Sequence, residues 1–365
     1  MKTIGIGGAG SKIAVKLDPQ CAAINISEIE LSKIPTSGEK IQASLRDGSG
    51  VFQGARMDPS IGLEAYGSVS RQLSNLIRGA MVIAATGGGT GNGIATGILR
   101  DLAARQGQIP VEEKTVFALV LPYGKMEPDE FVSNTSSFLN GPVAEAIDSG
   151  NTGNIFMFSN RVKFEKQLAE DKYNQMMVSS LQEFFAIPEK NAQLKLLEEH
   201  IDQADFALYL SKPYFNHFTA FNFNPENDFG KQLAAHWNPL LLEPEQPIEA
   251  LFLLEVPAGN DGTCFYSILK YFNDQEVKPL YSVVENPALK APRVSVSLLY
   301  SRKPAEEVQD FNREAEKHAQ TKVRRTIDQF VEPEQLQVNL ATEADKVKSS
   351  GEDDIIKMLK RINKL

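Results

Sequence analysis

Two glycine-rich segments constrain the fold of this chain more than any other feature. The first loop, Gly5–Gly10, reads GIGGAG, and the second loop, Thr86–Gly93, reads TGGGTGNG. So many glycines are needed where a backbone approaches an anion closely or adopts positive φ. Each segment follows an apolar run and precedes a helical pattern, so each places free backbone N–H groups at a helix N-terminus. The sequence therefore predicts two phosphate-binding loops at neighbouring strand ends.

The first loop alone leaves two interpretations open. It satisfies the dinucleotide fingerprint G-x-G-x-x-G, and Glu28 lies about where a ribose-binding acid is expected. An NAD-dependent oxidoreductase is therefore the first rival interpretation. The second loop favours a mononucleotide polyphosphate, because a dinucleotide enzyme needs only the first.

The first half of the chain alternates short apolar runs with helical patterns, which is typical of a parallel sheet with crossover helices. The expected strands are 3–6, 22–26, 81–85, 115–121 and 154–158, and the expected helices are 11–16, 62–77, 91–105, 128–139 and 142–147. The pattern predicts an α/β fold with a Rossmann-like nucleotide-binding domain over residues 1–162. Ligands of such sheets bind at the carboxyl ends of the strands.

The pattern of apolar and polar residues in the rest of the chain predicts four further parts of the structure. A long apolar central helix is expected over 163–187, and a second α/β domain with a mixed sheet over 188–303. Its expected strands are 218–223, 249–256, 279–284 and 293–300, and its expected helix is 259–273. An extended C-terminal helix is expected over 304–331, followed by a flexible tail, 332–365, whose amphipathic basic tip suits docking to a partner.

Composition narrows the class of protein. Cys21 and Cys264 lie far apart in sequence, so a disulfide framework is not expected. A reducing, cytoplasmic location is expected instead. A formal net charge of −9 argues against direct binding of nucleic acid. No stretch approaches the about 20 apolar residues that span a bilayer, and the start of the chain reads as a strand, so neither a membrane anchor nor a signal peptide is expected. The histidines and cysteines show no metal-ligand spacing, so no protein metal site is expected.

Residues Gly87–Gly93 resemble the phosphate signature loop of the tubulin/FtsZ superfamily, with Asn92 where Thr or Ser is usual. The similarity is greatest to its plasmid- and phage-borne TubZ branch. It implies a tubulin/FtsZ-like GTPase fold that binds GTP or GDP, with Mg²⁺ carried on the phosphates. The implied phosphate contacts are Gly7, Gly8, Ala9, Gly10 and Ser11 in the first loop, and Gly87, Gly88, Gly89, Thr90, Gly91, Asn92 and Gly93 in the second.

Two further regions of the nucleotide site rest on the same resemblance. The segment Gly54–Ala65 is similar to the γ-phosphate-sensing region of TubZ, which implies that Gly54, Ala55 and Arg56 face the terminal phosphate. Without the resemblance this segment reads as a surface loop that leads into a helix. Asn25, after the second expected strand, is implied to belong to the next nucleotide loop. The implied nucleoside contacts are Glu127 or Asp129 at the ribose, Asn160 and Asn174 at the guanine edge, and Tyr173 against the base.

The segment His200–Phe206 resembles the synergy loop of the superfamily, which enters the nucleotide pocket of the next subunit. The implied catalytic residues are Asp202, which ranks first, and Asp205. An acid so placed can orient and partly deprotonate the attacking water. Read from spacing alone, these acids mark a helix N-terminus. A second candidate, Asn224–Asp228, ranks lower because it follows the expected strand 218–223.

The resemblance implies a GTPase that polymerises head to tail and hydrolyses GTP between subunits. It further implies segregation of plasmid or phage DNA, through a DNA-binding adaptor that contacts the tail at residues 354–365. Three alternatives stay open: an FtsZ-like cell-division protein, a scaffold of the same fold that does not hydrolyse GTP, and the NAD-dependent oxidoreductase.

Overall fold

The computed structural model describes residues 1–45 and 54–301, together with positions 313, 316–317 and 320–321. The chain divides into two compact units, residues 1–315 and 316–365, and the first contains the fold described below. Most of the predicted C-terminal helix, and all of the predicted tail and its tip, lie outside the described residues.

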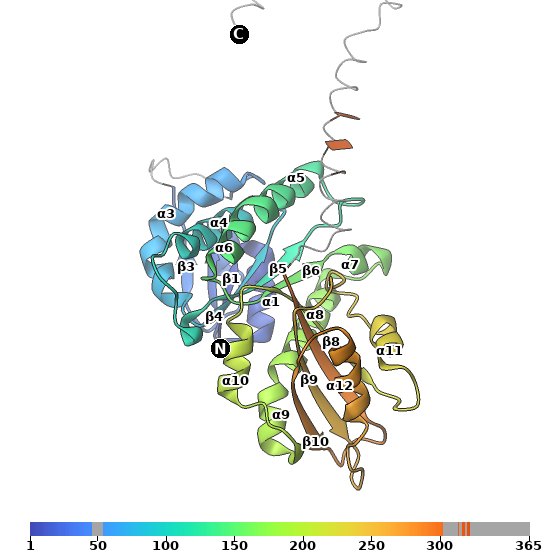
Figure 1. Ribbon diagram of the computed structural model, residues 1–365. Helices are drawn as coiled ribbons and strands as arrows, with labels where there is room; N and C mark the ends of the chain where they lie inside the picture. The colour runs from blue at the N-terminus through green and yellow to red at the C-terminus, as the bar shows by residue number, and fades with distance from the viewer. Residues whose placement is uncertain (46–53, 302–312, 314–315, 318–319, 322–365) are drawn as a thin grey trace, which may run out of the picture. The chain divides into compact units, whose positions relative to one another are not determined.

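The described strands form a single mixed sheet of eleven strands (Figure 1) in the order β3-β2-β1-β4-β5-β6-β8-β11-β9-β10-β7. Pairing is parallel from β3 to β8, antiparallel on both sides of β11, parallel between β9 and β10, and antiparallel at β7. The strands are β1 (Lys2–Ile6), β2 (Ala22–Asn25), β3 (Lys40–Gln42), β4 (Ala80–Ala85), β5 (Val116–Leu121), β6 (Ile155–Ser159), β7 (Lys195–Glu198), β8 (Phe215–Asn222), β9 (Glu249–Val256), β10 (Leu280–Glu285) and β11 (Arg293–Tyr300).

Helices connect these strands and cover both faces of the sheet. They are α1 (Gly7–Leu17), α2 (Glu28–Ser32), α3 (Pro59–Leu76), α4 (Gly89–Ala103), α5 (Asp129–Phe138), α6 (Ala144–Ser149), α7 (Arg161–Glu165), α8 (Glu170–Phe185), α9 (Ile187–Gln193), α10 (Gln203–Leu210), α11 (Phe229–Ala235) and α12 (Phe265–Asp274). A 3₁₀ turn, Val111–Glu113, and a π-helical turn, Leu139–Val143, complete the set. None of the helices within the described residues is long and apolar enough to cross a bilayer.

Burial explains the near-continuous apolar runs of the parallel strands. All six residues of β5 are buried, because helices lie on both sides of it. Phe117 joins the core formed with α3, α4, α5 and α6, whereas Ala118 joins the core formed with α1, α8 and α10. A third core fills the space between β8–β11 and the helices α11 and α12. The predicted α/β class with a mostly parallel sheet and a mixed second part is confirmed.

Two predicted helices differ from the structure. The central helix expected over 163–187 is interrupted: α7 ends at Glu165, and the chain turns through Gln167 at a φ of 51° before α8 begins. A residue with positive φ cannot continue a right-handed helix. The helix expected over 259–273 begins only at Phe265, because Gly259 and Gly262 adopt positive φ in the preceding turn. The domain boundaries themselves stay a prediction.

The two parts of the sheet meet at a short seam between β6 and β8. The described register pairs Ile155 with Phe215 and Phe156 with Asn216, whereas β8 and β11 pair over eight positions. Side chains add to the seam: Asn216 Nδ2 donates to Asn154 Oδ1 at 2.8 Å. Asn154 Nδ2 in turn donates to the carbonyl oxygen of Lys212 at 2.9 Å.

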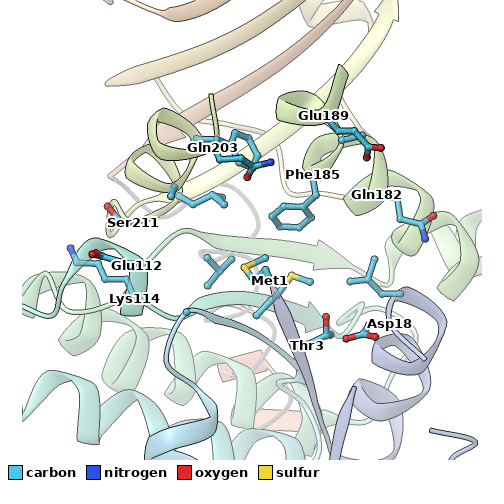
Figure 2. Close-up of a pocket in the computed structure, with 18 of the residues that line it drawn as sticks. Met1, Thr3, Asp18, Glu112, Lys114, Gln182, Phe185, Glu189, Gln203 and Ser211 are labelled. Atoms are coloured by element: carbon cyan, nitrogen blue, oxygen red, sulfur yellow. The ribbon is translucent and has the colours of Figure 1, made fainter. Parts of the chain in front are cut away.

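A cavity of about 830 Å³ lies at the amino ends of β1, β4 and β5 (Figure 2). Met1 and Thr3, at the start of the chain and in β1, line it from one side, and residues of α8 and α10 line it from the other. Figure 2 shows Phe185 pointing into it toward Met1. The cavity thus separates the N-terminal edge of the parallel sheet from the helix that follows the predicted catalytic loop.

Helices α3 and α4 approach each other closely through glycine. Gly89, Gly93 and Gly97 recur every four residues along α4, so they share one face of that helix. A Cβ at Gly93 would overlap the carbonyl oxygen of Pro59 and lie 2.5 Å from the amide nitrogen of Leu63, both in α3. Gly93 is therefore needed for helix packing, whatever its relation to a ligand.

We expect Gly93→Ala to lower the free energy of unfolding by about 1–3 kcal/mol, because an added methyl group overpacks this contact. Urea unfolding followed by circular dichroism measures the change. The matched control is Gly88→Ala, where a Cβ would have nothing within 4 Å. Equal losses in the two variants would contradict the packing role of Gly93.

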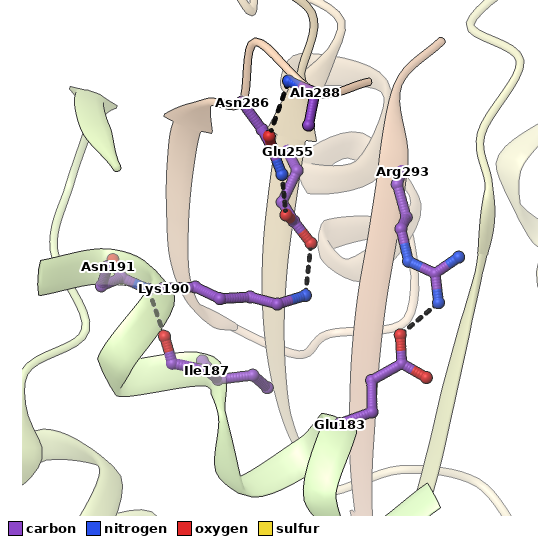
Figure 3. A network of polar contacts seen from close by, with 8 residues as sticks. All are labelled: Glu183, Ile187, Lys190, Asn191, Glu255, Asn286, Ala288 and Arg293. Atoms are coloured by element: carbon purple, nitrogen blue, oxygen red, sulfur yellow. Dashed lines mark hydrogen bonds and ion pairs between the residues drawn. The ribbon is translucent and has the colours of Figure 1, made fainter. Parts of the chain in front are cut away.

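A buried ion pair joins α9 to β9 (Figure 3). Glu255 is 2% exposed, and its two carboxylate oxygens accept from Lys190 Nζ and from Asn286 Nδ2, each at 2.7 Å. Nearby, Arg293 of β11 pairs with Glu183 of α8. These contacts fix the end of α8 and the start of α9 to the second part of the sheet.

We expect Lys190→Met to lower the free energy of unfolding by about 2–3 kcal/mol, because it leaves the Glu255 carboxylate buried without its cation. Lys195→Met is the control, since Lys195 pairs with Glu285 from an exposed position, and it should cost less than about 1 kcal/mol. Chemical denaturation at neutral pH measures both. An unchanged free energy of unfolding in Lys190→Met would show that the ion pair makes no net contribution to stability.

Candidate functional site

The two glycine-rich loops meet at the carboxyl ends of β1 and β4, which are parallel neighbours. Gly7 has a φ of 69°, and a Cβ there would lie 3.2 Å from the amide nitrogen of Gly91, so the loops touch. A cavity of about 960 Å³ opens beside them, a size typical of nucleotide and cofactor sites. Helices α1, α2 and α8 form its other walls.

The structure brings part of the predicted binding set to this cavity. The predicted residues that line it are Gly7, Gly8, Ala9, Gly88, Gly89, Thr90, Gly91 and Asn174. The predicted residues outside this lining are Gly10, Ser11, Asn25, Gly54, Ala55, Arg56, Gly87, Asn92, Gly93, Glu127, Asn160 and Tyr173. Direct ligand contacts of both groups stay predictions.

Backbone N–H groups are the main polar feature of the cavity at the two loops. Gly88 is the N-cap of α4, the 15-residue helix that begins at Gly89, and α1 begins directly after β1 at Gly7. Neither N-terminus has a side-chain cap, so no capping side chain accepts a hydrogen bond from the first amides of these helices. Two helix N-termini that converge on one cavity favour an anion such as a polyphosphate.

Charged side chains that the sequence analysis missed also line the cavity. Lys12 and Lys16 extend from α1 and pair with Glu170 and Asp171 of α8 at 2.9 and 2.8 Å. Glu30 reaches over the first loop, where its Oε2 would lie 3.0 Å from a Cβ at Gly8. A sequence signal existed for Glu30, because Ser27 and Glu30 have the spacing of a helix capping box, and the Ser27 hydroxyl accepts from the Glu30 amide.

The side chains of Asn25 and Ser11 bond to neighbouring protein groups and do not line the cavity. Asn25 is 2% exposed, and its Nδ2 donates to Glu30 Oε2 at 2.9 Å. The buried Ser11 hydroxyl donates to the carbonyl oxygen of Gly5 at 3.1 Å. Asn25 therefore reaches the cavity only through Glu30, and Ser11 closes the first turn of α1.

The buried side chain of Asn92 stabilises the second loop through three hydrogen bonds. Its Nδ2 donates to the carbonyl oxygens of Thr86 at 2.6 Å and of Asn134 at 3.1 Å, and its Oδ1 accepts from Thr96 at 3.3 Å. Thr or Ser at this position would offer one donor in place of two. Asn92 in place of Thr or Ser therefore changes the hydrogen bonds between the second loop and α5. The cavity is lined by the neighbouring residues of the loop and not by Asn92.

The segment 54–58 lies behind the second loop and leads into α3. Arg56 and Met57 have φ of 48° and 63°, which is uncommon for residues other than glycine. Asp58 caps α3, with its Oδ1 accepting from the hydroxyl of Ser60 at 2.7 Å and from the amide of Ser60 at 2.8 Å. These bonds, the hydroxyl bond first, lower the pKa of the Asp58 carboxyl. A Cβ at Gly89 would lie 2.6 Å from that of Ala55, so this segment packs directly on the start of α4.

Three of the predicted nucleoside residues gather at the ends of β5 and β6. Asn160 Nδ2 donates to the two carboxylate oxygens of Glu127 at 3.2 and 3.0 Å. Tyr173 is 1% exposed, and its hydroxyl donates to the carbonyl oxygen of Ser159 at 2.6 Å. Burial, with Glu127 nearby, raises the pKa of this phenol. Tyr173 thus packs in the core, while Asn174, the next residue, lines the cavity.

Asp129 is the first residue of α5, and the alternative ribose contact at this position stays a prediction.

The predicted catalytic acids lie at the start of α10. Asp202 is its N-cap, and its Oδ1 accepts from the amide of Asp205 at 2.8 Å. This hydrogen bond lowers the pKa of the fully exposed Asp202 carboxyl. Asp228, in the lower-ranked segment, caps α11 in the same way through the amide of Lys231. Capping geometry therefore does not separate the two candidates.

Position along the sheet separates the predicted catalytic acids from the two glycine loops. The cavity shown in Figure 2 is lined by Gln203 of α10 and by Thr3 near the start of β1. The cavity at the glycine loops is lined by Ile6, at the end of the same strand. A strand of five residues spans roughly 16 Å, so α10 and the two loops lie at opposite ends of β1. Asp202 is thus placed away from the loops of its own chain.

No cluster of three or more histidine, cysteine or acidic side chains suited to a metal ion occurs among the residues described.

Comparison with known proteins identifies the fold. No protein-family model matches the sequence, and no curated protein matches it. Solved structures do match. The GTPγS-form protofilament of Bacillus thuringiensis serovar israelensis TubZ has a TM-score of 0.72 at 14% identity, covering 90% of this chain and 94% of that one. Clostridium botulinum phage c-st TubZ, truncated at its C-terminal tail, has a TM-score of 0.62 at 18% identity, covering 87% and 97%.

The FtsZ dimer of M. jannaschii has a TM-score of 0.58 at 18% identity, covering 82% of this chain and 87% of that one. These matches extend over most of the chain. The chain therefore has the fold of the tubulin/FtsZ superfamily, with TubZ structures among those it resembles.

Proposed function

We propose that this protein is a GTPase that binds GTP at the two glycine loops, polymerises head to tail and hydrolyses the nucleotide at the joint between subunits. The observation that carries the proposal is the separation of the two halves of the site. The loops lie at the carboxyl ends of β1 and β4, and Asp202 lies beside a cavity at the amino ends of the same strands. A second copy stacked on the first would bring its Asp202 to the open cavity.

The loops supply the binding half of this site. Amides at the starts of α1 and α4 would donate to the phosphates, and Gly88 leaves room for close approach because nothing lies within 4 Å of its Cβ position. Asn174 would contact the base from α8, where it lines the same cavity. Amide side chains both donate and accept, which suits the edge of a purine.

Asp202 supplies the catalytic half. Its carboxylate is ionised at neutral pH, as an aspartate ordinarily is, so it can accept a hydrogen bond from water and orient it toward the terminal phosphate. Asp205, which donates its amide to Asp202, is the second acid of the proposed pair. Because Asp202 is fully exposed, it is free to enter a neighbouring subunit.

A divalent cation fits this arrangement as part of the nucleotide. Mg²⁺ is usually held by phosphates and one or two carboxylates, and Glu30 is the carboxylate that lies over the first loop. When bound, the cation would offset phosphate charge. Glu30 is the residue we assign to hold it.

The cellular role we propose is segregation of plasmid or phage DNA through a DNA-binding adaptor, with no direct contact to nucleic acid. It rests on the resemblance of the glycine loops and of residues 54–65 and 200–206 to TubZ, and on the TubZ structures named above. The contact with the adaptor is proposed for residues 354–365, which lie outside the described part of the chain. An FtsZ-like role in division is the alternative within the same fold.

We expect Asp202→Ala to lower GTP turnover per subunit by at least tenfold while leaving nucleotide binding within about twofold, because Asp202 acts on the neighbouring site. Turnover is measured against protein concentration, with right-angle light scattering recorded in parallel. Asp228→Ala is the matched control, since it removes an equivalent N-cap from α11. Specific activity that stays flat with concentration in the parent would contradict assembly-coupled hydrolysis.

Mixing two defective variants tests the shared site directly. Gly88→Trp would obstruct the cavity of one subunit at the second loop but leave its Asp202 intact, and Asp202→Ala leaves the cavity intact. A mixture should turn over GTP faster than either variant alone, because some joints then combine one intact half from each. No gain from mixing, with both variants folded and assembling with the parent, would mean that Asp202 does not act across the joint.

A further inference from the structure

We propose that Asn134 is a positioning residue that holds segment 54–58 in its strained shape against the second glycine loop, and so makes the site distinguish nucleotides with a terminal phosphate from those without one. The inference rests on the proposed function for the identity of the ligand. The contacts themselves belong to three segments distant in sequence: 54–58, the second loop and α5.

Asn134 bridges two backbones with one amide group. Its Nδ2 donates to the carbonyl oxygen of Met57 at 2.8 Å and to that of Gly87 at 2.9 Å. Both N–H groups of the amide are thereby used, one on each segment. The side chain therefore fixes the distance between segment 54–58 and the second loop.

The direction of this amide is set by further contacts of α5 with the second loop. The carbonyl oxygen of Asn134 accepts from Asn92, and the hydroxyl of Thr135 lies 2.8 Å from that of Thr86, both buried. A Cβ at Gly87 would lie 2.8 Å from Phe131 Cβ, one turn earlier in α5. The second loop and α5 thus form one supported unit, from which Asn134 reaches outward to Met57.

Segment 54–58 is the strained partner in this contact. Arg56 and Met57 are consecutive residues with positive φ, and Met57 is 49% exposed, so packing of its side chain does little to stabilise that conformation. Such strain persists only where surrounding structure enforces it, and it concentrates at functional sites. The enforcing contacts are the Asn134 bond to Met57, the bond from the Asp58 amide to the carbonyl oxygen of Ala55 at 2.7 Å, and packing on Gly89.

Segment 54–58 is connected to the cavity through the second glycine loop. Gly88 and Gly89 line the cavity, and Gly89 also contacts Ala55 and Asp58 from behind. A phosphate group that orders the backbone at Gly88 and Gly89 therefore favours the strained position of segment 54–58, and Asn134 keeps that position available before the ligand arrives. In this proposal the terminal phosphate of GTP is the group that orders Gly88 and Gly89. Without Asn134, binding of the triphosphate must also offset the strain, so affinity for the triphosphate falls, while affinity for the diphosphate, which lacks that phosphate, changes little.

The test compares the full chain with Asn134→Ala and with the control Ser133→Ala, an exposed neighbour on α5. Affinities for fluorescent GDP and GTPγS are measured by titration, and hydrogen exchange of residues 54–58 is measured without nucleotide. Because two hydrogen bonds are lost, we expect Asn134→Ala to weaken GTPγS binding about tenfold, leave GDP within about twofold, and speed exchange at Asp58 about tenfold. Ser133→Ala should match the parent in all three.

A second substitution separates positioning from general stability. Glycine at position 57 adopts positive φ without strain, so Met57→Gly in the Asn134→Ala background should recover at least half of the lost GTPγS affinity, on a logarithmic scale. Equal weakening of GDP and GTPγS together with a lowered melting temperature, or no recovery by Met57→Gly, would overturn the positioning role. If the parent binds neither nucleotide, the proposed function fails, and unchanged exchange at Asp58 in Asn134→Ala would then overturn the contact independently.

Discussion

The parallel direction of β1 and β4 is the constraint on which the rest of the site depends. Parallel neighbours end at the same edge of the sheet, so the loops that follow them converge there. That convergence brings Gly7 and Gly91 into contact and turns two helix N-termini toward one cavity. The same direction places the starts of these strands at the far edge, beside α10. The predicted binding and catalytic groups are thus separated by the length of a strand, and a monomer could not join them without moving one across the sheet.

The glycines of the second loop serve two requirements at once. Gly88 leaves open space at the cavity, whereas Gly93 and Gly97 admit α3 to the surface of α4, and Gly89 touches both sides. A sequence motif that reads as a phosphate loop is therefore also a helix-packing motif. This double use ties the shape of the loop to the position of α3 and of segment 54–58, because α3 cannot withdraw without opening the glycine contact.

The sequence predicted the fold because its strongest signals were local. Apolar runs such as Val116–Leu121 and the glycine loops are read from neighbouring residues, and they predicted the parallel sheet and the edge of the sheet at which the cavity beside the loops lies. The break between α7 and α8 was missed because it depends on the positive φ of Gln167, a residue type without a strong preference for that conformation. Asn134 was missed for a different reason. Its partner Met57 lies 77 positions away, and an asparagine in a helix gives no sign of a contact at that separation.

The seam between β6 and β8 has a mechanical consequence. Only two register pairs join these strands within the described residues, beside eight between β8 and β11. The rest of β6 pairs with residues 240–242, where the Leu242 amide donates to Met157 and the Ser159 amide donates to Leu240. The side-chain amides of Asn154 and Asn216 add further bonds at this line. Tension applied across the sheet is therefore shared here by a short ladder, by segment 240–242 and by side chains. A core that contains both Phe156 of β6 and Leu253 of β9 also spans the line, so bending the sheet there would disturb apolar packing on both sides of it.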